Sequence, residues 1–273
     1  FAANQLDAAL GALERLLAAE PEHERARMLK LAVLIRQEKT SASAEYEGRL
    51  RSAADGRWII ALGHVTAERA LGKHAEAARR LEELAGTEAG NDKLRTLLID
   101  AYADWARSVG GAQAIVPLEK LTALAPERLS AWRDLGWSYW AAGQRDAALS
   151  AWDRAIRGEL PGREKLVTQI VGQLCDEGKS ADALALLHRW QLDARLLPIA
   201  IELAKSGRYQ AAYPLFEALW QSGQQPLVSG LYLAVAEARL GQCVQVLPRL
   251  APALEALSLL PSERVELVLA ALI

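Results

Sequence analysis

The sequence is poor in the residues that build disulfide frameworks, metal sites and catalytic centres. Its 273 residues include two cysteines and four histidines. Cys175 and Cys243 lie far apart, without the spacing of metal ligands, and we expect both to be small buried side chains. The histidines form no zinc-binding pair, and we expect them to be exposed or half-buried on helices: His23, His64, His74 and His188.

Other kinds of chemistry also lack a signature. No glycine-rich phosphate loop follows a strand, and acidic pairs such as Glu82-Glu83 are typical of solvated helix faces. The sequence therefore predicts no catalytic residue, no cofactor and no metal site. We therefore expect that the chain is not itself an enzyme.

Long apolar runs and an excess of positive charge are missing as well. No apolar run reaches the ~18 residues of a membrane span, so no direct membrane span is expected. The 32 Lys and Arg residues against 34 Asp and Glu give a net charge of −2, so no nucleic-acid partner is expected. Because the chain begins at Phe1 without Met and ends at Ile273 in an apolar periodic segment, we expect a piece of a longer protein.

A helical pattern runs along nearly the whole sequence. Ala, Leu, Glu, Arg and Gln are abundant and favour helices, whereas the polar–apolar alternation of strands does not occur. Apolar residues recur at steps of three and four, as at Leu6, Leu10, Leu13 and Leu17. The pattern predicts an all-α fold.

Glycines divide this pattern at regular intervals. Gly143, Gly178, Gly207 and Gly241 each lie between two helical segments, at steps of 35, 29 and 34 residues. A glycine can end a helix because it adopts the left-handed conformation without strain. A period near 34 residues built from a helical hairpin indicates a solenoid.

The unit from Leu129 to Gly162 carries the fullest repeat pattern. Gly136 and Ala148 are small, which predicts that the two helices of the hairpin cross closely there. The pattern comprises Trp132, Leu135, Gly136 and Tyr139 on the first helix, then Gly143, Ala148, Trp152, Ala155 and Pro161. It resembles the tetratricopeptide repeat. The resemblance implies a right-handed α-solenoid of about seven antiparallel hairpins.

The other units keep part of the pattern, with two departures. In the second unit Lys39–Ser43 is expected to replace the turn glycine, and in the last full unit Pro248 and Pro252 predict a bent or shortened second helix. We expect one solenoid over 1–273, with units at roughly 1–22, 23–54, 55–90, 91–127, 128–162, 163–192, 193–225 and 226–258 and a terminal helix at 262–273.

The resemblance implies a scaffold that binds a partner protein or peptide in a concave groove. Trp132, Leu135 and Tyr139 are expected to face the second helix of their hairpin. The complementary face carries two further tryptophans, which favour an aromatic anchor in a peptide or polysaccharide groove. Packing between neighbouring repeats is the alternative. The predicted partner-binding residues are Arg133, Trp137, Trp140, Arg107, Arg69 and Thr168.

Three further expectations concern the source of the chain, the protein it belongs to and its self-association. The Ala-, Leu- and Arg-rich composition favours a bacterial protein, and the irregular repeats resemble periplasmic arrays in exopolysaccharide-secretion assemblies of the envelope. The alternative is a regulatory or substrate-recruiting module attached to an enzyme domain outside this chain. Apolar end faces predict self-association, at Leu6, Leu10 and Leu13 and at Val265, Leu267, Val268, Leu269 and Leu272.

Overall fold

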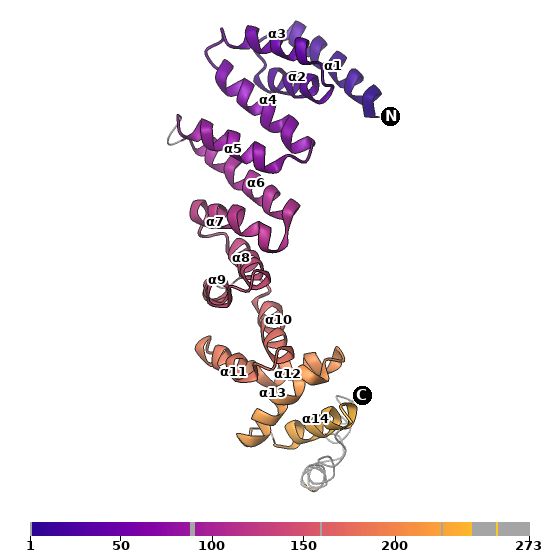
Figure 1. The fold of residues 1–273 in the computed structure, drawn as a ribbon, viewed down its shortest axis with the longest axis vertical. Helices are drawn as coiled ribbons and strands as arrows, with labels where there is room; N and C mark the ends of the chain where they lie inside the picture. The colour runs from indigo at the N-terminus through magenta and orange to yellow at the C-terminus, as the bar shows by residue number, and fades with distance from the viewer. Residues whose placement is uncertain (1, 88–90, 159, 225, 242–254, 256–273) are drawn as a thin grey trace. The chain divides into compact units, whose positions relative to one another are not determined.

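The described part of the chain is all-α, as the sequence pattern predicts (Figure 1). The computed structural model describes residues 2–87, 91–158, 160–224, 226–241 and 255. These residues form α-helices joined by short turns, with two brief 3₁₀ helices and no strand. The bend predicted from Pro248 and Pro252, and the apolar end face around Val265, lie outside the described residues.

The chain divides into two compact units, Phe1–Arg154 and Ala155–Ile273, and the boundary falls within α9. The helices that begin in the first unit are α1 (Ala2–Ala19), α2 (Glu24–Arg36), α3 (Thr40–Leu50), α4 (Gly56–Ala70), α5 (His74–Ala85), α6 (Asp92–Val109), η1 (Gly111–Ala114), α7 (Ile115–Leu124), α8 (Leu129–Ala141) and α9 (Arg145–Arg157). Those of the second unit are α10 (Arg163–Asp176), α11 (Ser180–Arg189), η2 (Asp193–Arg195), α12 (Leu196–Lys205), α13 (Tyr209–Gln221) and α14 (Pro226–Arg239).

In the first unit each helix packs on its neighbours along the chain. Contacts join α1 to α2, α2 to α4, and then α4 through α8 in order, while α3 lies beside α2 and α4 (Figure 1). Tight turns join most of these helices, so neighbours run antiparallel. A continuous core extends from α4 to α9 and includes Leu81, Leu98, Leu118 and Leu135, each almost fully buried.

The second unit has a core of its own. α13 packs against α10, α12 and α14, and α11 packs against α10 and α13. Phe216 on α13 is fully buried, and its ring stacks on that of Tyr232 on α14, with ring centroids 5.2 Å apart. This aromatic pair joins the two helices.

The turn glycines adopt the conformation that the sequence predicts for them. Gly143 has a φ of 75°, and the N–H of Gln144 donates to the carbonyl of Tyr139 at 2.9 Å, which closes α8. The same left-handed conformation occurs at Gly72, Gly178, Gly207 and Gly241.

Two turns of the same kind lack a glycine. Glu38 has a φ of 55° and Gln191 a φ of 58°, and the N–H of the following residue again reaches back five residues, to Leu34 and Leu187. The turn predicted at Lys39–Ser43 therefore lies earlier, because Glu38 takes the left-handed position and α3 begins at Thr40. The sequence does not indicate that this glutamate is left-handed, because residues other than glycine rarely adopt this conformation.

Candidate functional site

The predicted contact residues fall in both units. Thr168 lies on α10 of the second unit, and the others lie in the first: Arg133, Trp137 and Trp140 on α8, Arg107 on α6 and Arg69 on α4.

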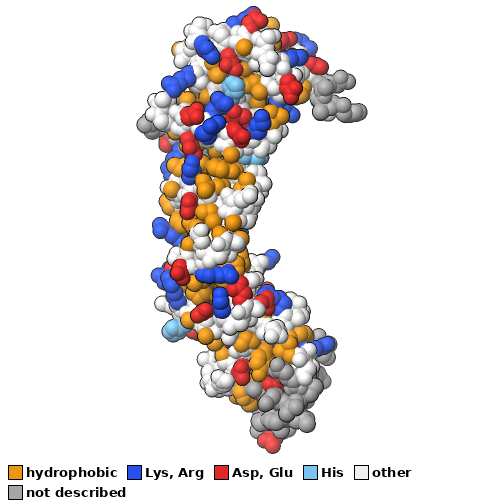
Figure 2. Space-filling view, viewed as in Figure 1, with side chains coloured by type: hydrophobic (Ala, Val, Ile, Leu, Met, Phe, Trp, Pro, Cys, Tyr) orange, Lys and Arg blue, Asp and Glu red, His pale blue; other side chains and the backbone are white. Residues whose placement is uncertain are grey.

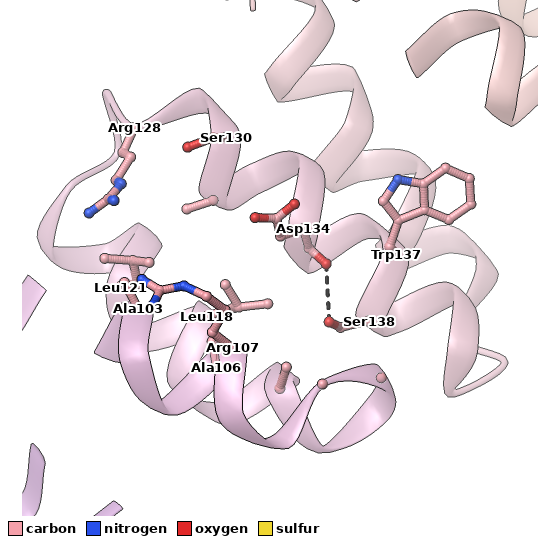
Figure 3. A pocket seen from close by; sticks show the side chains of 14 residues that line it. Ala103, Ala106, Arg107, Leu118, Leu121, Arg128, Ser130, Asp134, Trp137 and Ser138 are labelled. Atoms are coloured by element: carbon pink, nitrogen blue, oxygen red, sulfur yellow. Dashed lines mark hydrogen bonds between the residues drawn. The ribbon is translucent and has the colours of Figure 1, made fainter. Parts of the chain in front are cut away.

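A hollow of about 340 Å³ lies between α6, α7 and α8 of the first unit (Figure 3). It brings together two predicted residues, Arg107 and Trp137. Arg69, Arg133 and Trp140 do not line it. Two of the five predicted residues in the first unit therefore line the hollow, and the other three lie outside its lining.

Small side chains create this hollow. Ala103 and Ala106 on α6, Ala114 before α7 and Ala131 on α8 line it and leave the space between the helices unfilled. Leu118 and its neighbour Leu121 on α7 are buried and form an apolar floor. An alanine-rich sequence gives no sign of where such a space will open, because that depends on how three helices meet.

Polar residues outside the predicted contact set stand around this floor. Arg128, Asp134 and Ser138 line the hollow, and Ser130 lies one turn before Asp134 on α8. In Figure 3 the guanidinium groups of Arg107 and Arg128 lie toward one side, and Trp137 lies toward the other. The Ser138 hydroxyl donates to the carbonyl oxygen of Asp134 at 3.0 Å (dashed line). The hollow therefore has an apolar base and a charged rim.

Two of the predicted arginines meet at one carboxylate beside this rim. Arg69 on α4 forms an ion pair with Asp104 on α6, and Arg107 approaches the other oxygen of Asp104 at 3.1 Å. The side chain of Asp104 is 18% exposed, whereas that of Arg107 is 74% exposed. Arg69 thus neutralises an aspartate next to the hollow, while Arg107 remains largely open to solvent.

The acidic residue in the lining is also paired. Nε of Arg133 donates to a carboxylate oxygen of the adjacent Asp134 at 2.8 Å. Arg128, by contrast, is exposed, and its guanidinium makes no hydrogen bond or ion pair within the part of the chain described. Arg128 lies before the first residue of α8, so the helical periodicity that predicts the other contact residues does not include it.

Two of the three α8 tryptophans, Trp137 and Trp140, pack inside their own hairpin. Trp152 on α9 is fully buried, and the rings of Trp137 and Trp140 approach its ring with centroid distances of 4.7 and 5.4 Å. Arg145 lies over the Trp140 ring at 3.5 Å. Both rings therefore contribute to packing within the hairpin, which the sequence interpretation did not anticipate, and both stay partly exposed.

The close crossing predicted at Gly136 is present. A Cβ atom added at Gly136 would lie 2.2 Å from the Trp152 ring, so only glycine allows α8 to approach this ring. Ala148 on α9 is fully buried. Of the residues expected to face inward, Leu135 is buried and Tyr139 is half-buried. The hydroxyl of Tyr139 donates to Glu119 on α7 at 2.6 Å. Burial first, and then this hydrogen bond, raise the pKa of Tyr139 to about 12.

The second unit holds its predicted residues in buried positions. The hydroxyl of Thr168 donates to the carboxylate of Glu202 at 3.1 Å, and its side chain is buried. Cys175 is buried as expected, and burial raises the pKa of its thiol to about 12. Cys243 lies outside the described residues.

The histidines are exposed or half-buried, as expected. His64 contacts Glu47 at 2.8 Å, His188 contacts Asp193 at 3.2 Å, and His23 accepts a hydrogen bond from the N–H of Ala26 at the start of α2. No group of three or more His, Cys, Asp or Glu side chains that could hold a metal ion occurs among the described residues. Within the same residues, every helix is too short or too polar to cross a lipid bilayer.

No model of a known protein family matches the chain, and no curated protein matches it at a significant level.

Proposed function

We propose that the chain is a tetratricopeptide-type repeat scaffold that binds a partner protein or peptide. The proposal includes the right-handed solenoid of about seven repeats implied by the sequence resemblance. Sequential antiparallel helices in the first unit, closed by left-handed turns such as those at Gly72 and Gly143, support it.

Side-chain contacts one repeat apart also support the proposal. Trp58 donates to Glu24 across 34 residues, and Arg69 pairs with Asp104 across 35 residues. In the second unit Thr168 donates to Glu202 across 34 residues. Each contact joins helices separated by about one sequence period, as stacked repeats require, because each repeat touches its neighbours.

The hollow between α6, α7 and α8 is the observation that carries the binding function. It opens to solvent, has an apolar floor, and is bordered by arginine and tryptophan, residue types that are enriched in binding hot spots. Its volume of about 340 Å³ is comparable with ligand-binding sites, which span roughly 300–1,000 Å³. On the face shown in Figure 2, apolar side chains are visible among charged ones of both signs over the first unit.

The bacterial setting belongs to the same proposal. A role in an exopolysaccharide-secretion assembly would place the chain in the periplasm. Fractionation of the native cells with an antibody to the chain tests this. Recovery with periplasmic markers is expected, and recovery with cytosolic markers would reject the setting but leave the scaffold proposal standing.

Selection of a displayed random peptide library on the folded chain tests the scaffold function. We expect enriched peptides that compete with one another and lose affinity when Ser130→Trp fills the hollow. The control is Ser150→Trp, which places the same side chain at an exposed position on α9. Thermal unfolding of both variants reports whether they fold. Absence of enriched peptides, or equal binding by the two folded variants, would reject the proposed function at this hollow.

A further inference from the structure

The hollow combines a floor and a rim of different chemistry. Leu118, Leu121 and Ala106 at its base are at least nine-tenths buried and belong to the core of the first unit. Arg107 and Arg128 stand at its rim with largely exposed side chains. A ligand that enters would meet an apolar surface below and guanidinium groups at the edge.

Arginines outnumber acidic residues at and beside the rim. Asp104 keeps its partner Arg69 even when Arg107 turns toward a ligand, and Asp134 is paired with Arg133. The Arg107–Asp104 pair is solvent-exposed on the arginine side, and exposed pairs of this kind contribute only about 0–1 kcal/mol. Arg107 can therefore exchange one carboxylate for another at little cost, and Arg128 is available throughout.

We propose that this hollow binds an acidic–aliphatic segment of a partner polypeptide. An aspartate or glutamate side chain lies between Arg107 and Arg128, and a neighbouring aliphatic side chain rests on the leucine floor. The inference rests on the proposed function and specifies the chemistry of its partner, since a planar guanidinium pairs with a carboxylate through two parallel N–H donors.

Fluorescence anisotropy with blocked, dye-labelled peptides tests this chemistry. An acidic–aliphatic peptide is compared with the same sequence carrying amides in place of the carboxylates, and acetylated and amidated ends exclude binding through a terminal charge. We expect the acidic peptide to bind more tightly, and the difference to shrink as salt rises, because these charges are exposed.

Arginine variants locate the interaction. Arg128→Ala and Arg107→Ala are each expected to weaken the acidic peptide about fivefold, and the double variant tenfold or more. Arg79→Ala is the matched control, because Arg79 is an exposed arginine on α5 that does not line the hollow. Arg128→Glu should reverse the preference, so that a peptide with lysine in place of the acidic residue binds better than the acidic one.

A second pair of peptides tests the aliphatic half of the proposal. The acidic peptide with serine in place of its aliphatic residue should bind the wild type more weakly, because it leaves the floor of Leu118 and Leu121 uncovered. Equal binding of these two peptides would overturn the aliphatic half. Urea unfolding checks that the arginine variants retain the fold, as expected for exposed positions.

The outcomes separate this inference from the proposed function. Equal binding of the acidic and amide peptides, or an unchanged affinity of the Arg107→Ala/Arg128→Ala double variant, overturns the acidic specificity while peptide binding itself stands. Failure of every peptide, including those enriched from the random library, overturns the scaffold function as well.

Discussion

At the residue scale, one left-handed glutamate stores strain that a glycine would remove. Glu38 has a φ of 55° and an exposed side chain. A left-handed residue other than glycine costs about 1–2 kcal/mol, and glycine returns roughly 0.5–1 kcal/mol of this through the entropy of the unfolded chain. We expect Glu38→Gly to raise the free energy of unfolding by about 0.5 kcal/mol.

Urea unfolding measures this change. Glu83→Gly is the control, since Glu83 is an exposed helical position on α5 where glycine should cost about 1 kcal/mol. A lower stability for Glu38→Gly would show that the carboxylate side chain contributes more to this turn than its backbone costs.

At Gly136, by contrast, a substitution should lower the stability, because the structure leaves no space for an added methyl group. The new Cβ would lie 2.2 Å from Trp152, whose buried ring contacts those of Trp137 and Trp140. Gly136→Ala should therefore lower the free energy of unfolding by about 1–3 kcal/mol, despite the better helix propensity of alanine.

Gly48→Ala provides the comparison in chemical denaturation. Gly48 is an exposed glycine on α3 with no atom within 4 Å of an added Cβ, and alanine there should stabilise the chain by up to about 1 kcal/mol. If both substitutions stabilise the protein, the crossing of α8 and α9 is looser than the structure indicates.

Single residues also show where prediction from sequence ends. Gly136 could be predicted as a close crossing because glycine weakens a helix and therefore indicates close packing where it interrupts a helical pattern. The positions of Arg128 and Asp134 at the hollow could not be predicted from the sequence. They depend on which helices meet and on which acidic side chains are already paired with Arg69 and Arg133. Local charge balance is a property of tertiary structure.

At the element scale, the partly buried tyrosine between α7 and α8 makes stability depend on alkaline pH. Tyr139 donates to Glu119, and burial and this bond raise its pKa from 10.0 to about 12. A raised pKa means that the folded state holds the proton more tightly. The contribution to stability is therefore complete below pH 10 and is lost as pH rises from about 10 to about 12.

Tyr139→Phe should remove this part of the pH dependence. The measurement is the free energy of unfolding across that alkaline range for the wild type and the variant, because other tyrosines and lysines contribute equally to both curves. Parallel curves would mean that Tyr139 titrates as it does in the unfolded chain.

Helices were more predictable than the contacts between them. Apolar periodicity and glycine breaks predict most of α4 to α13, because each signal is local in the sequence. The turn before α3 was placed too late, since Glu38 carries no turn signal. The contacts of Trp137 and Trp140 with Trp152 were missed, because periodicity places side chains on a face but does not say which neighbour fills it.

At the scale of the whole molecule, the two compact units should respond to mutation separately. Phe216 is fully buried in the second unit, and Phe216→Ala should cost about 3–5 kcal/mol there. We expect faster amide hydrogen exchange in α12–α14 and unchanged exchange in α4–α6, because each unit has its own core.

Leu81→Ala in the first unit supplies the reciprocal experiment, since Leu81 is buried on α5. It should accelerate exchange in α4–α6 and leave α12–α14 unchanged. Acceleration along the entire chain by either substitution would show that the chain unfolds as one cooperative body.

Three of the four tryptophans of the α8–α9 hairpin, Trp137, Trp140 and Trp152, have an optical consequence. The ring centroids of Trp137 and Trp140 lie 4.7 and 5.4 Å from that of Trp152, and the two rings are inclined to the Trp152 ring at 66° and 36°. In this geometry the indole transition dipoles couple and split the ultraviolet circular dichroism band. Trp137 is at once a member of this chromophore and part of the lining of the hollow. Any molecule that settles there and shifts the indole changes the amplitude of the split band, so the protein can report its own occupancy without a label.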